Sequence, residues 1–231
     1  MINQVAEPDT RTRLIHAAMR LFWEKGYGST SVADVLQTAK VNSGSLYHFF
    51  PGKQDLLLAV LDTYRAGTRE MLIEPAWRGV GDPIERIFAL LARYRKSLED
   101  TDCVYGCPIG SLALELHEPD LPVRERLAAN FSAWIDSIAA CLEAAGSRLP
   151  SDCNRRALAG FVLTTMEGAV MQARTYRELR RFDDAIGQLR RYFDSLLTQA
   201  KPDAQSRAKT KEPSCASPSS RRQRRPRSSR S

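Results

Sequence analysis

Apolar residues recur at intervals of three and four through almost all of residues 10–200. This spacing places them on one face of an α-helix, and it is typical of amphipathic helices that bury that face. The longest example covers residues 123–142, where the apolar positions are Val123, Leu127, Phe131, Trp134, Ile138 and Leu142. No segment shows the alternation of apolar and polar residues expected of a half-buried strand. The sequence therefore predicts an all-α fold.

The first 65 residues contain the start and stop signals of several short helices. Ser31 followed by Asp34 predicts a capping box at the start of one helix, and Asn42 is a suitable N-cap for the next. Pro51–Gly52 ends that second short helix, and a longer helix is expected from Lys53. Two short helices joined by a tight turn, with a third helix packed across them, form a helix-turn-helix unit. In such units the second short helix enters the major groove of DNA.

The charge of the chain is unevenly distributed. The net charge is +7, but residues 201–231 hold ten Lys or Arg and two Asp or Glu, whereas the other 200 residues hold 24 basic and 25 acidic side chains. Around the second short helix, from Lys40 to Gln54, there is no acidic residue. For the approach to a polyanion, this local absence of carboxylates matters more than the net charge.

Two segments carry a specific resemblance. Residues 30–32 read Thr-Ser-Val, and residues 41–53 read Val-Asn-Ser-Gly-Ser-Leu-Tyr-His-Phe-Phe-Pro-Gly-Lys. Together they resemble the DNA-binding region of the TetR family of bacterial transcriptional regulators, over roughly residues 10–65. The stretch 106–112 resembles one subgroup of that family. The resemblance implies an N-terminal three-helix helix-turn-helix domain followed by a helical domain that binds a ligand and dimerises.

The resemblance assigns the DNA contacts to residues in and around the second short helix. Ser31 would cap the first of the two short helices, which begins after it, and would donate to a phosphate. The Tyr47 hydroxyl would contact another phosphate. Lys40 stands where the family commonly has Gly, which implies strain in the turn or an extra phosphate contact. Phe49 replaces a common His or Tyr. The implied DNA-binding residues are Ser31, Lys40, Ser43, Gly44, Ser45, Tyr47, His48 and Lys53.

The predicted organisation has four parts: a flexible arm at 1–9, the DNA-binding domain at 10–65, the ligand-binding and dimerisation domain at 66–200, and a disordered basic tail at 201–231. By the resemblance, the helices expected at 155–177 and 183–199 pair with those of a second copy to form a homodimer. Two recognition helices would then meet a near-palindromic site on double-stranded DNA, roughly 34 Å apart. A small-molecule or electrophile inducer would release this repressor from its operator.

Candidate ligand-contacting residues lie in the second domain. Tyr94, Trp134, Phe161 and Met166 are large side chains that either line a cavity or pack in the core. Glu167 stands in an otherwise apolar stretch. It is either a polar group of the cavity or a residue that faces solvent or an arginine.

Cys107 precedes Pro108, at the expected N-cap of a helix. A helix N-terminus lowers the pKa of a thiol and makes it more nucleophilic. Cys103, four residues earlier, is a suitable resolving partner. We therefore predict that Cys107 senses electrophiles or oxidants, the alternative being a small buried apolar residue.

Other classes of function are disfavoured. A catalytic pair of Cys107 and His117 would be separated by about 15 Å along one helix, so an enzyme is not expected. The five cysteines form no CxxC pair and the three histidines are not grouped near them, so no metal site or other cofactor is predicted. No apolar run approaches the roughly 20 residues that span a bilayer, and the N-terminus has no export signal. We expect a cytoplasmic protein, with a tail-driven general nucleic-acid-binding protein as the alternative function.

Overall fold

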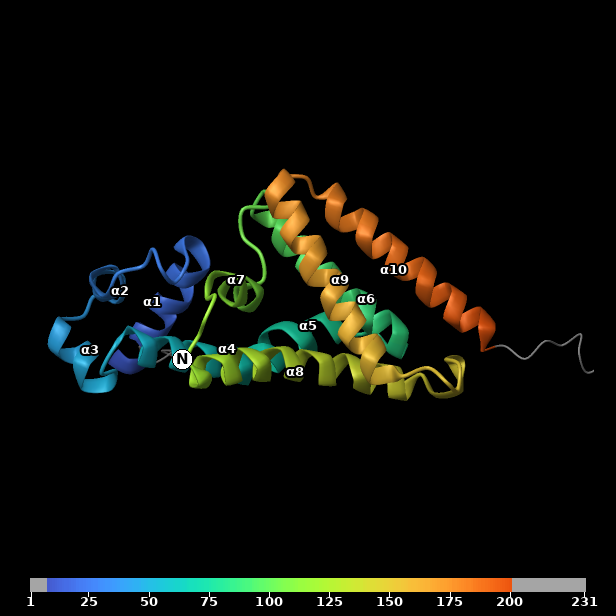
Figure 1. Cartoon of the computed structure of the whole chain (residues 1–231), viewed down its shortest axis with the longest axis horizontal. Coiled ribbons are helices and arrows are strands. Elements are labelled where there is room, and N and C mark those ends of the chain that lie inside the picture. Colours follow the sequence, from blue (N-terminus) through green and yellow to red (C-terminus); the bar gives the residue numbers. More distant parts are fainter. Residues whose placement is uncertain (1–7, 201–231) are drawn as a thin grey trace, which may run out of the picture. The chain divides into compact units, whose positions relative to one another are not determined.

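The structure is a computed structural model that describes residues 8–200. Every regular element in this part of the chain is helical, as predicted (Figure 1). The elements are α1 Thr10–Lys25, α2 Val32–Ala39, α3 Ser43–Phe49, α4 Lys53–Thr68, the π-helical turn η1 Arg69–Ile73, α5 Glu74–Trp77, α6 Pro83–Asp100, α7 Pro108–Glu115, α8 Leu121–Ala144, the 3₁₀ turn η2 Gly146–Arg148, α9 Arg155–Tyr176 and α10 Arg180–Gln199. The predicted tail at 201–231 and most of the predicted arm at 1–9 lie outside the described residues.

The short helices begin at the predicted caps. The Ser31 hydroxyl accepts from the backbone N–H of Asp34, whose carboxylate accepts from the backbone N–H of Ser31, so the capping box is complete. The Asn42 side chain accepts from the backbone N–H of Ser45 at 2.9 Å and caps α3. Two of the orphan N–H groups of these short helices are thereby satisfied within the chain.

Lys40 ends α2 in the left-handed conformation, with φ 54° and ψ 50°. This backbone is strained for a residue with a Cβ atom, which confirms the turn strain inferred from the sequence. The Arg13 guanidinium donates to the carbonyls of Ala39 and Lys40, at 2.5 and 2.8 Å, and fastens this turn to α1.

Lys40→Gly is expected to raise the free energy of unfolding by about 0.5–1 kcal/mol. Glycine removes the steric cost of the left-handed backbone, and its greater freedom in the unfolded chain offsets part of that gain. Urea unfolding measures the difference. Lys40→Ala keeps the Cβ atom and should leave the unfolding free energy near that of the parent, so an equal gain in both variants would contradict this account.

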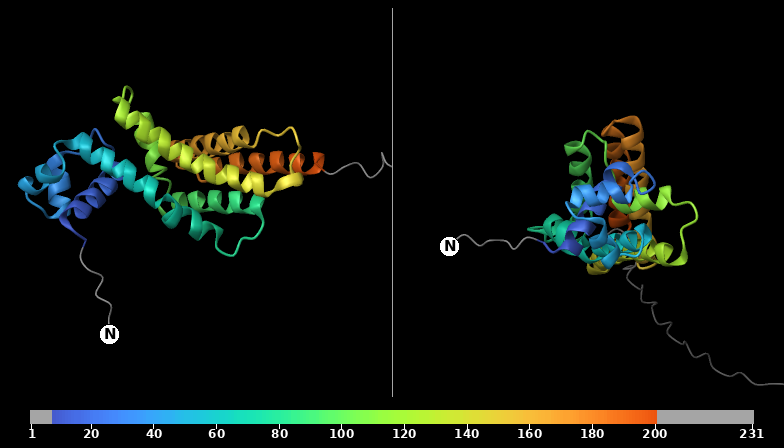
Figure 2. Two further views of the ribbon diagram at one scale, coloured as in Figure 1. Left: turned by 90° about the horizontal axis from the view of Figure 1, so that it is seen from below. Right: turned by 90° about the vertical axis from the view of Figure 1, so that its left-hand side faces the viewer.

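Two apolar cores lie within residues 8–200. One joins α1–α4 to α7 and the first half of α8, and it includes Leu14, Leu46, Leu61, Leu112 and Leu127. The other is formed by α5, α6, α9, α10 and the rest of α8. Helix α4 packs against both α1 and α8, and α4 and α8 run side by side in Figures 1 and 2. The helix-turn-helix elements therefore share their core with α7 and α8.

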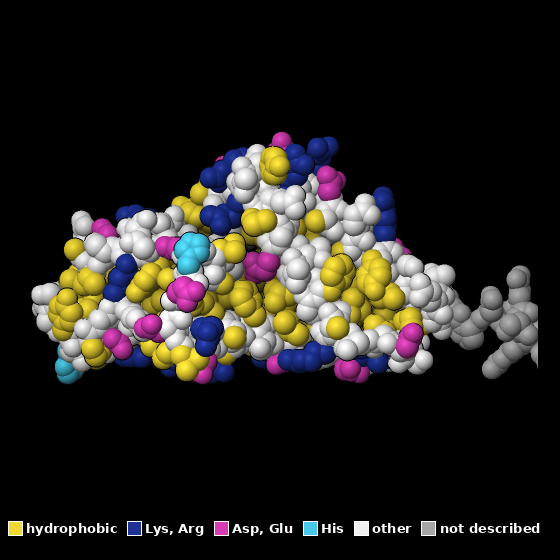
Figure 3. All heavy atoms as spheres, in the orientation of Figure 1, with side chains coloured by type: hydrophobic (Ala, Val, Ile, Leu, Met, Phe, Trp, Pro, Cys, Tyr) yellow, Lys and Arg dark blue, Asp and Glu magenta, His cyan; other side chains and the backbone are white. Residues whose placement is uncertain are grey.

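Helices α9 and α10 pack against each other on one side of this assembly (Figures 1 and 2). Several large apolar side chains on these two helices remain exposed, namely Phe161, Met171, Tyr176 and Tyr192. Phe161 and Tyr192 stack edge-to-face with ring centroids 5.8 Å apart. In Figure 3 apolar side chains gather over α9 and the adjoining part of α10. None of the described helices combines the length and apolar character needed to cross a membrane.

Candidate DNA-binding surface and ligand cavity

Helix α3 presents its polar residues outward. Leu46 and Phe50 are buried and hold the helix in the core, whereas Ser43, Gly44 and His48 are exposed. The Tyr47 side chain is 58% exposed, so its hydroxyl is free to reach a phosphate. Ser45 is half-buried, and its hydroxyl donates to the Asn42 side chain. This outward face has the length and the polar groups needed by a recognition helix in a major groove.

Two further predicted contacts flank α3. Ser31 is exposed at the start of α2, where its hydroxyl donates to the Asp34 carboxylate at 2.7 Å. Lys40 is exposed in the turn between α2 and α3. A phosphate contact by Ser31 would require its hydroxyl proton to leave Asp34.

Lys53 opens α4 and is partly engaged within the chain. Its ammonium group donates to the Tyr27 carbonyl at 2.5 Å and lies 4.2 Å from the centre of the Tyr27 ring. Partial burial lowers the pKa of Lys53 from its ordinary value. Two of its three N–H bonds remain for a phosphate. Gly52 caps α4 without a side chain, so the first amides of this helix are open to an anion as well.

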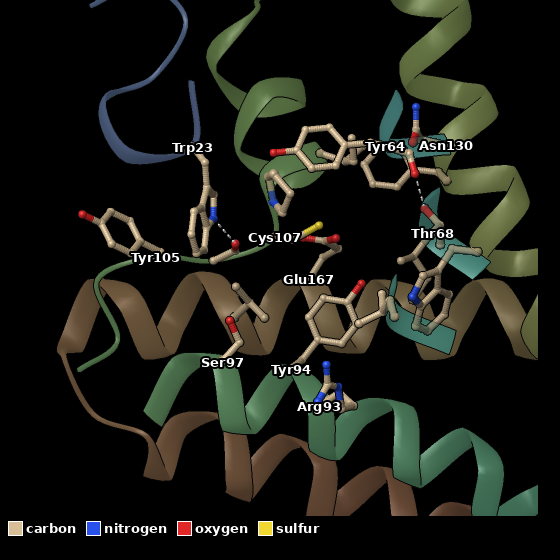
Figure 4. A pocket seen from close by; sticks show the side chains of 18 of the residues that line it. Trp23, Tyr64, Thr68, Arg93, Tyr94, Ser97, Tyr105, Cys107, Asn130 and Glu167 are labelled. Carbon is tan, nitrogen blue, oxygen red and sulfur yellow. Dashed lines mark hydrogen bonds between the residues drawn. The ribbon is translucent and has the colours of Figure 1, made fainter. Parts of the chain in front are cut away.

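A cavity of about 370 Å³ lies behind the helix-turn-helix elements, among α1, α4, α6, α7, α8 and α9 (Figure 4). Six aromatic side chains contribute to its walls, namely Trp23, Tyr64, Tyr94, Tyr105, Phe131 and Trp134. Four of the residues singled out in the sequence meet here: Tyr94, Cys107, Trp134 and Glu167. The volume falls at the lower end of the range typical of small-molecule sites.

Three residues predicted for this site lie elsewhere. Phe161 is 49% exposed on the outer face of α9, beside Tyr192, because the apolar stripe of α9 is wide enough to serve two surfaces. Met166 is fully buried in the core formed with α6 and α10. Cys103 is buried in the connection before α7 and does not line the cavity. Phe161 and Met166 therefore do not line this cavity, and the role of Cys103 as a resolving partner of Cys107 stays a prediction.

The surroundings of Cys107 disfavour the reactive state predicted for it and favour the alternative, a small buried residue. The residue is the N-cap of α7, as expected, and its sulfur accepts from the Gly110 N–H at 3.5 Å. However, burial raises the pKa of the Cys107 thiol far above its usual range, and the negative charge of Glu167 raises it further. Because the loss of hydration outweighs one weak hydrogen bond, this thiol stays protonated at neutral pH.

Cys107 is therefore expected to react with iodoacetamide at least about tenfold more slowly than Cys153 at pH 7.5, because only the thiolate is a good nucleophile. Cys153 is a suitable internal standard because it is half-buried and free. Peptide mass spectrometry of the alkylated native protein gives both rates. Faster labelling of Cys107 would restore the electrophile-sensing hypothesis.

Glu167 points from α9 toward Cys107 at the base of the cavity (Figure 4). Burial raises the pKa of Glu167, and the neighbouring thiol offsets only part of that rise. Its Oε1 atom is buried without a hydrogen-bond partner, and so is the Trp134 Nε1 atom. Burial also raises the pKa of Tyr94, whose hydroxyl points into the same space. Unpartnered buried polar atoms are costly, so the cavity offers one strong acceptor and one donor to a ligand.

Sequence reasoning missed several lining residues, including Trp23, Tyr64 and Asn130. Trp23 belongs to α1, yet its indole N–H donates to the Gly106 carbonyl at 2.7 Å, directly beside Cys107. The pair is separated by 83 positions in the chain. No local pattern identifies the partner of Trp23, which lies outside the buried face of α1.

Helix α7 connects the cavity to the helix-turn-helix elements. At its start, Gly110 lies so close to Glu167 that a Cβ atom there would meet the carboxylate at 2.2 Å. At its end, the Glu115 carboxylate accepts from the backbone N–H groups of Tyr27 and Gly28, at 2.9 and 2.6 Å. The turn held by Glu115 is the turn that receives Lys53. The two ends of α7 thus lie against Glu167 of the cavity and against the turn that precedes α2.

The chain matches two family models. Residues 14–60 match that of the bacterial regulatory proteins of the tetR family, and residues 83–188 match that of the LmrA/YxaF-like transcriptional regulators, C-terminal domain. An uncharacterised HTH-type transcriptional regulator of Mycobacterium tuberculosis is 35% identical over 185 residues, covering 78% of this chain and 92% of the relative. The HTH-type transcriptional repressor DhaR of a Mycobacterium species is 25% identical over 196 residues, covering 84% and 95%.

The fold agrees with these matches. The crystal structure of the regulatory protein TetR from Rhodobacter sphaeroides superposes with a TM-score of 0.70 at 26% identity, covering 80% of this chain and 96% of the other. The helix-turn-helix elements and the cavity-bearing helices are thus both accounted for by one family. The chain belongs to the TetR family of bacterial transcriptional regulators.

Proposed function

We propose that this regulator is a homodimeric repressor that is released from its operator by a small molecule bound in the cavity. The observation that carries the proposal is the pair of contacts made by α7, with Gly110 against Glu167 at one end and Glu115 on the Tyr27–Gly28 turn at the other. A ligand that favours a different position of Glu167 would bind the DNA-free state of the protein more tightly than the DNA-bound state. Such a difference is the thermodynamic requirement for induction.

The proposed partners are a second copy of the chain and double-stranded DNA in the cytoplasm. The exposed apolar residues of α9 and α10 support pairing through residues 155–177 and 183–199, as a four-helix bundle. A two-fold dimer would bind a near-palindromic site with half-sites roughly 34 Å apart. The proposed DNA-contacting residues remain those of α3 and its flanks, Ser31, Lys40, Ser43, Gly44, Ser45, Tyr47, His48 and Lys53.

Fluorescence anisotropy of the full chain tests this function, with DNA from upstream of its own gene and a scrambled duplex of equal length. A preference of about 10³-fold or more at physiological salt is expected of a site-specific repressor. Sedimentation of the complex should give two chains per duplex. Equal binding to both duplexes, with a steep salt dependence and displacement by bulk DNA, would instead establish a general nucleic-acid-binding protein driven by the basic tail.

Glu115→Ala is expected to lower the affinity for the operator about fivefold. The variant loses two hydrogen bonds to a charged acceptor, so the turn that positions α2 and Lys53 is held less firmly. The same anisotropy assay measures the change. Glu118→Ala removes an exposed carboxylate just beyond α7 and serves as the charge control. Equal effects of the two substitutions would show that charge, and not the anchored turn, controls DNA affinity.

A further inference from the structure

We propose that the cavity binds an organic cation, namely a protonated amine carried on a compact aromatic body, with Glu167 as its counter-ion. The inference rests on the proposed function in taking this cavity as the inducer site. It adds the chemical class of the inducer, which depends on how the charged and polar atoms of the cavity are already partnered.

Glu167 is the only acidic residue that lines the cavity, and it has no ion-pair partner among the described residues. Arg174, on the same helix, is occupied elsewhere. Its Nε donates to the Val104 carbonyl at 3.2 Å and its Nη1 to the Ser111 hydroxyl at 3.1 Å. Arg93 is an exposed residue of the lining (Figure 4). The buried Oε1 atom of Glu167 is thus left for a ligand.

A cation fits this acceptor better than a neutral or acidic ligand. A buried carboxylate is costly while it is unpaired, and a positive charge in hydrogen-bond contact removes most of that cost. An anion would add a second negative charge at the same place. The aromatic walls also favour a cation, because the faces of Trp and Tyr rings attract positive charge. The Trp134 N–H donates no hydrogen bond among the described residues, and an acceptor atom elsewhere on a ligand would satisfy it, but binding of the cation does not depend on that contact.

The pH dependence follows from the same groups. Since burial raises the pKa of Glu167, the carboxylate of the empty cavity takes up a proton at higher pH than an exposed one. A cation needs the ionised form, so its affinity rises as pH increases through this pKa. Burial raises the pKa of both the Cys107 thiol and the Tyr94 phenol, so these two neighbours stay neutral there. The other charged groups near Glu167 are Arg93, in the cavity lining, and Arg174, on the same helix.

Three probes of nearly equal size and different charge test the proposal: naphthylmethylamine, naphthylmethanol and naphthoic acid. Isothermal titration calorimetry with the full chain at pH 7.5 gives each dissociation constant. We expect the amine to bind at least about tenfold more tightly than the alcohol, and the acid to bind most weakly. Amine affinity should increase between pH 5 and pH 7.5, whereas alcohol affinity should stay nearly constant. Tighter binding of the alcohol or the acid, or no binding of the amine, would overturn the proposal.

Glu167→Gln keeps the shape of the side chain and removes its charge. This variant is expected to lose about tenfold in amine affinity and little in alcohol affinity. Glu143→Gln removes a surface carboxylate from α8 and should change neither. If Glu167→Gln does not fold, the ratio of amine to alcohol affinity and its pH dependence in the parent chain decide the matter alone.

The operator assay separates this proposal from the function on which it rests. Amine binding without release of operator DNA would support the ligand class and contradict the assignment of the cavity as the inducer site. Specific operator binding together with a preference for the neutral or acidic probe would support the proposed repressor function. It would contradict the proposal that the ligand is an organic cation. The two ideas therefore fail in different experiments.

Discussion

Gly44→Glu is expected to lower the affinity for the operator by about 100-fold or more. Gly44 is exposed near the start of α3, and a Cβ atom there would meet only the Asn42 side chain, at 3.5 Å. The substitution is therefore compatible with the fold and favours the helix. It places a carboxylate where the proposed interface meets phosphates and base edges, and such like-charge juxtaposition costs several kcal/mol.

Anisotropy with the upstream duplex measures this loss. Unfolding followed by circular dichroism verifies that the free energy of unfolding changes by less than about 0.5 kcal/mol. Gly81→Glu adds the same charge to the connection before α6, at a site open to solvent. It should leave operator affinity within about twofold of the parent, because its carboxylate lies outside the proposed interface. Normal DNA binding by Gly44→Glu would remove α3 from the interface.

Phe193→Ala is expected to lower the free energy of unfolding by about 3–5 kcal/mol. Phe193 is fully buried in α10 and packs edge-to-face on Phe88 of α6, with ring centroids 5.4 Å apart. The Arg190 guanidinium covers the same Phe88 ring, with 3.4 Å between its central carbon and the ring centroid. Truncation would leave a cavity between the two helices, because rigid neighbours cannot close over the lost ring.

Urea unfolding at one fixed protein concentration measures this loss, since the proposed dimerisation would make apparent stability concentration-dependent. Leu114→Ala is the control, because the Leu114 side chain is 68% exposed on α7. Its substitution should change the unfolding free energy by less than about 0.5 kcal/mol. A loss below about 1 kcal/mol in Phe193→Ala would mean that α10 contributes little to the core of the single chain.

The helices and their ends could be predicted from the sequence because their signals are local. The capping box of Ser31 and Asp34 acts over three residues, and the Asn42 cap acts over the same distance. The strain at Lys40 was inferred from the family resemblance, because the family commonly has Gly at this turn position. Local interactions of this kind do not depend on the remainder of the fold.

The cavity could be predicted only in part, because its walls come from six helices. Tyr94, Trp134 and Glu167 stood out as large or charged residues in apolar stretches, but so did Phe161, which the fold places outside. Periodicity identifies the apolar face of a helix and leaves open which neighbour that face meets. The contact of Trp23 with Gly106 is set by tertiary packing alone.

At Cys107 the local sequence and the tertiary surroundings favour opposite states of the thiol. Its position at the N-cap of α7 was predicted, and its hydrogen bond from Gly110 favours the thiolate. Burial against Glu167 has the larger effect and favours the thiol. The hydrogen bond from Gly110 comes from a residue close to Cys107 in the sequence. The burial against Glu167 depends on α9, a helix that begins almost 50 residues later.

The shared core of α1–α4, α7 and α8 limits how DNA specificity can be exchanged within the family. A chimaera joined just after α4 would combine helix-turn-helix elements from one parent with residues 107–127 from another, and their buried faces would no longer match. Transplanting the exposed residues of α3 avoids this mismatch, because Leu46 and Phe50 keep their native packing. Engineering of new operator preferences therefore has a natural unit in this protein, and that unit is one face of one helix.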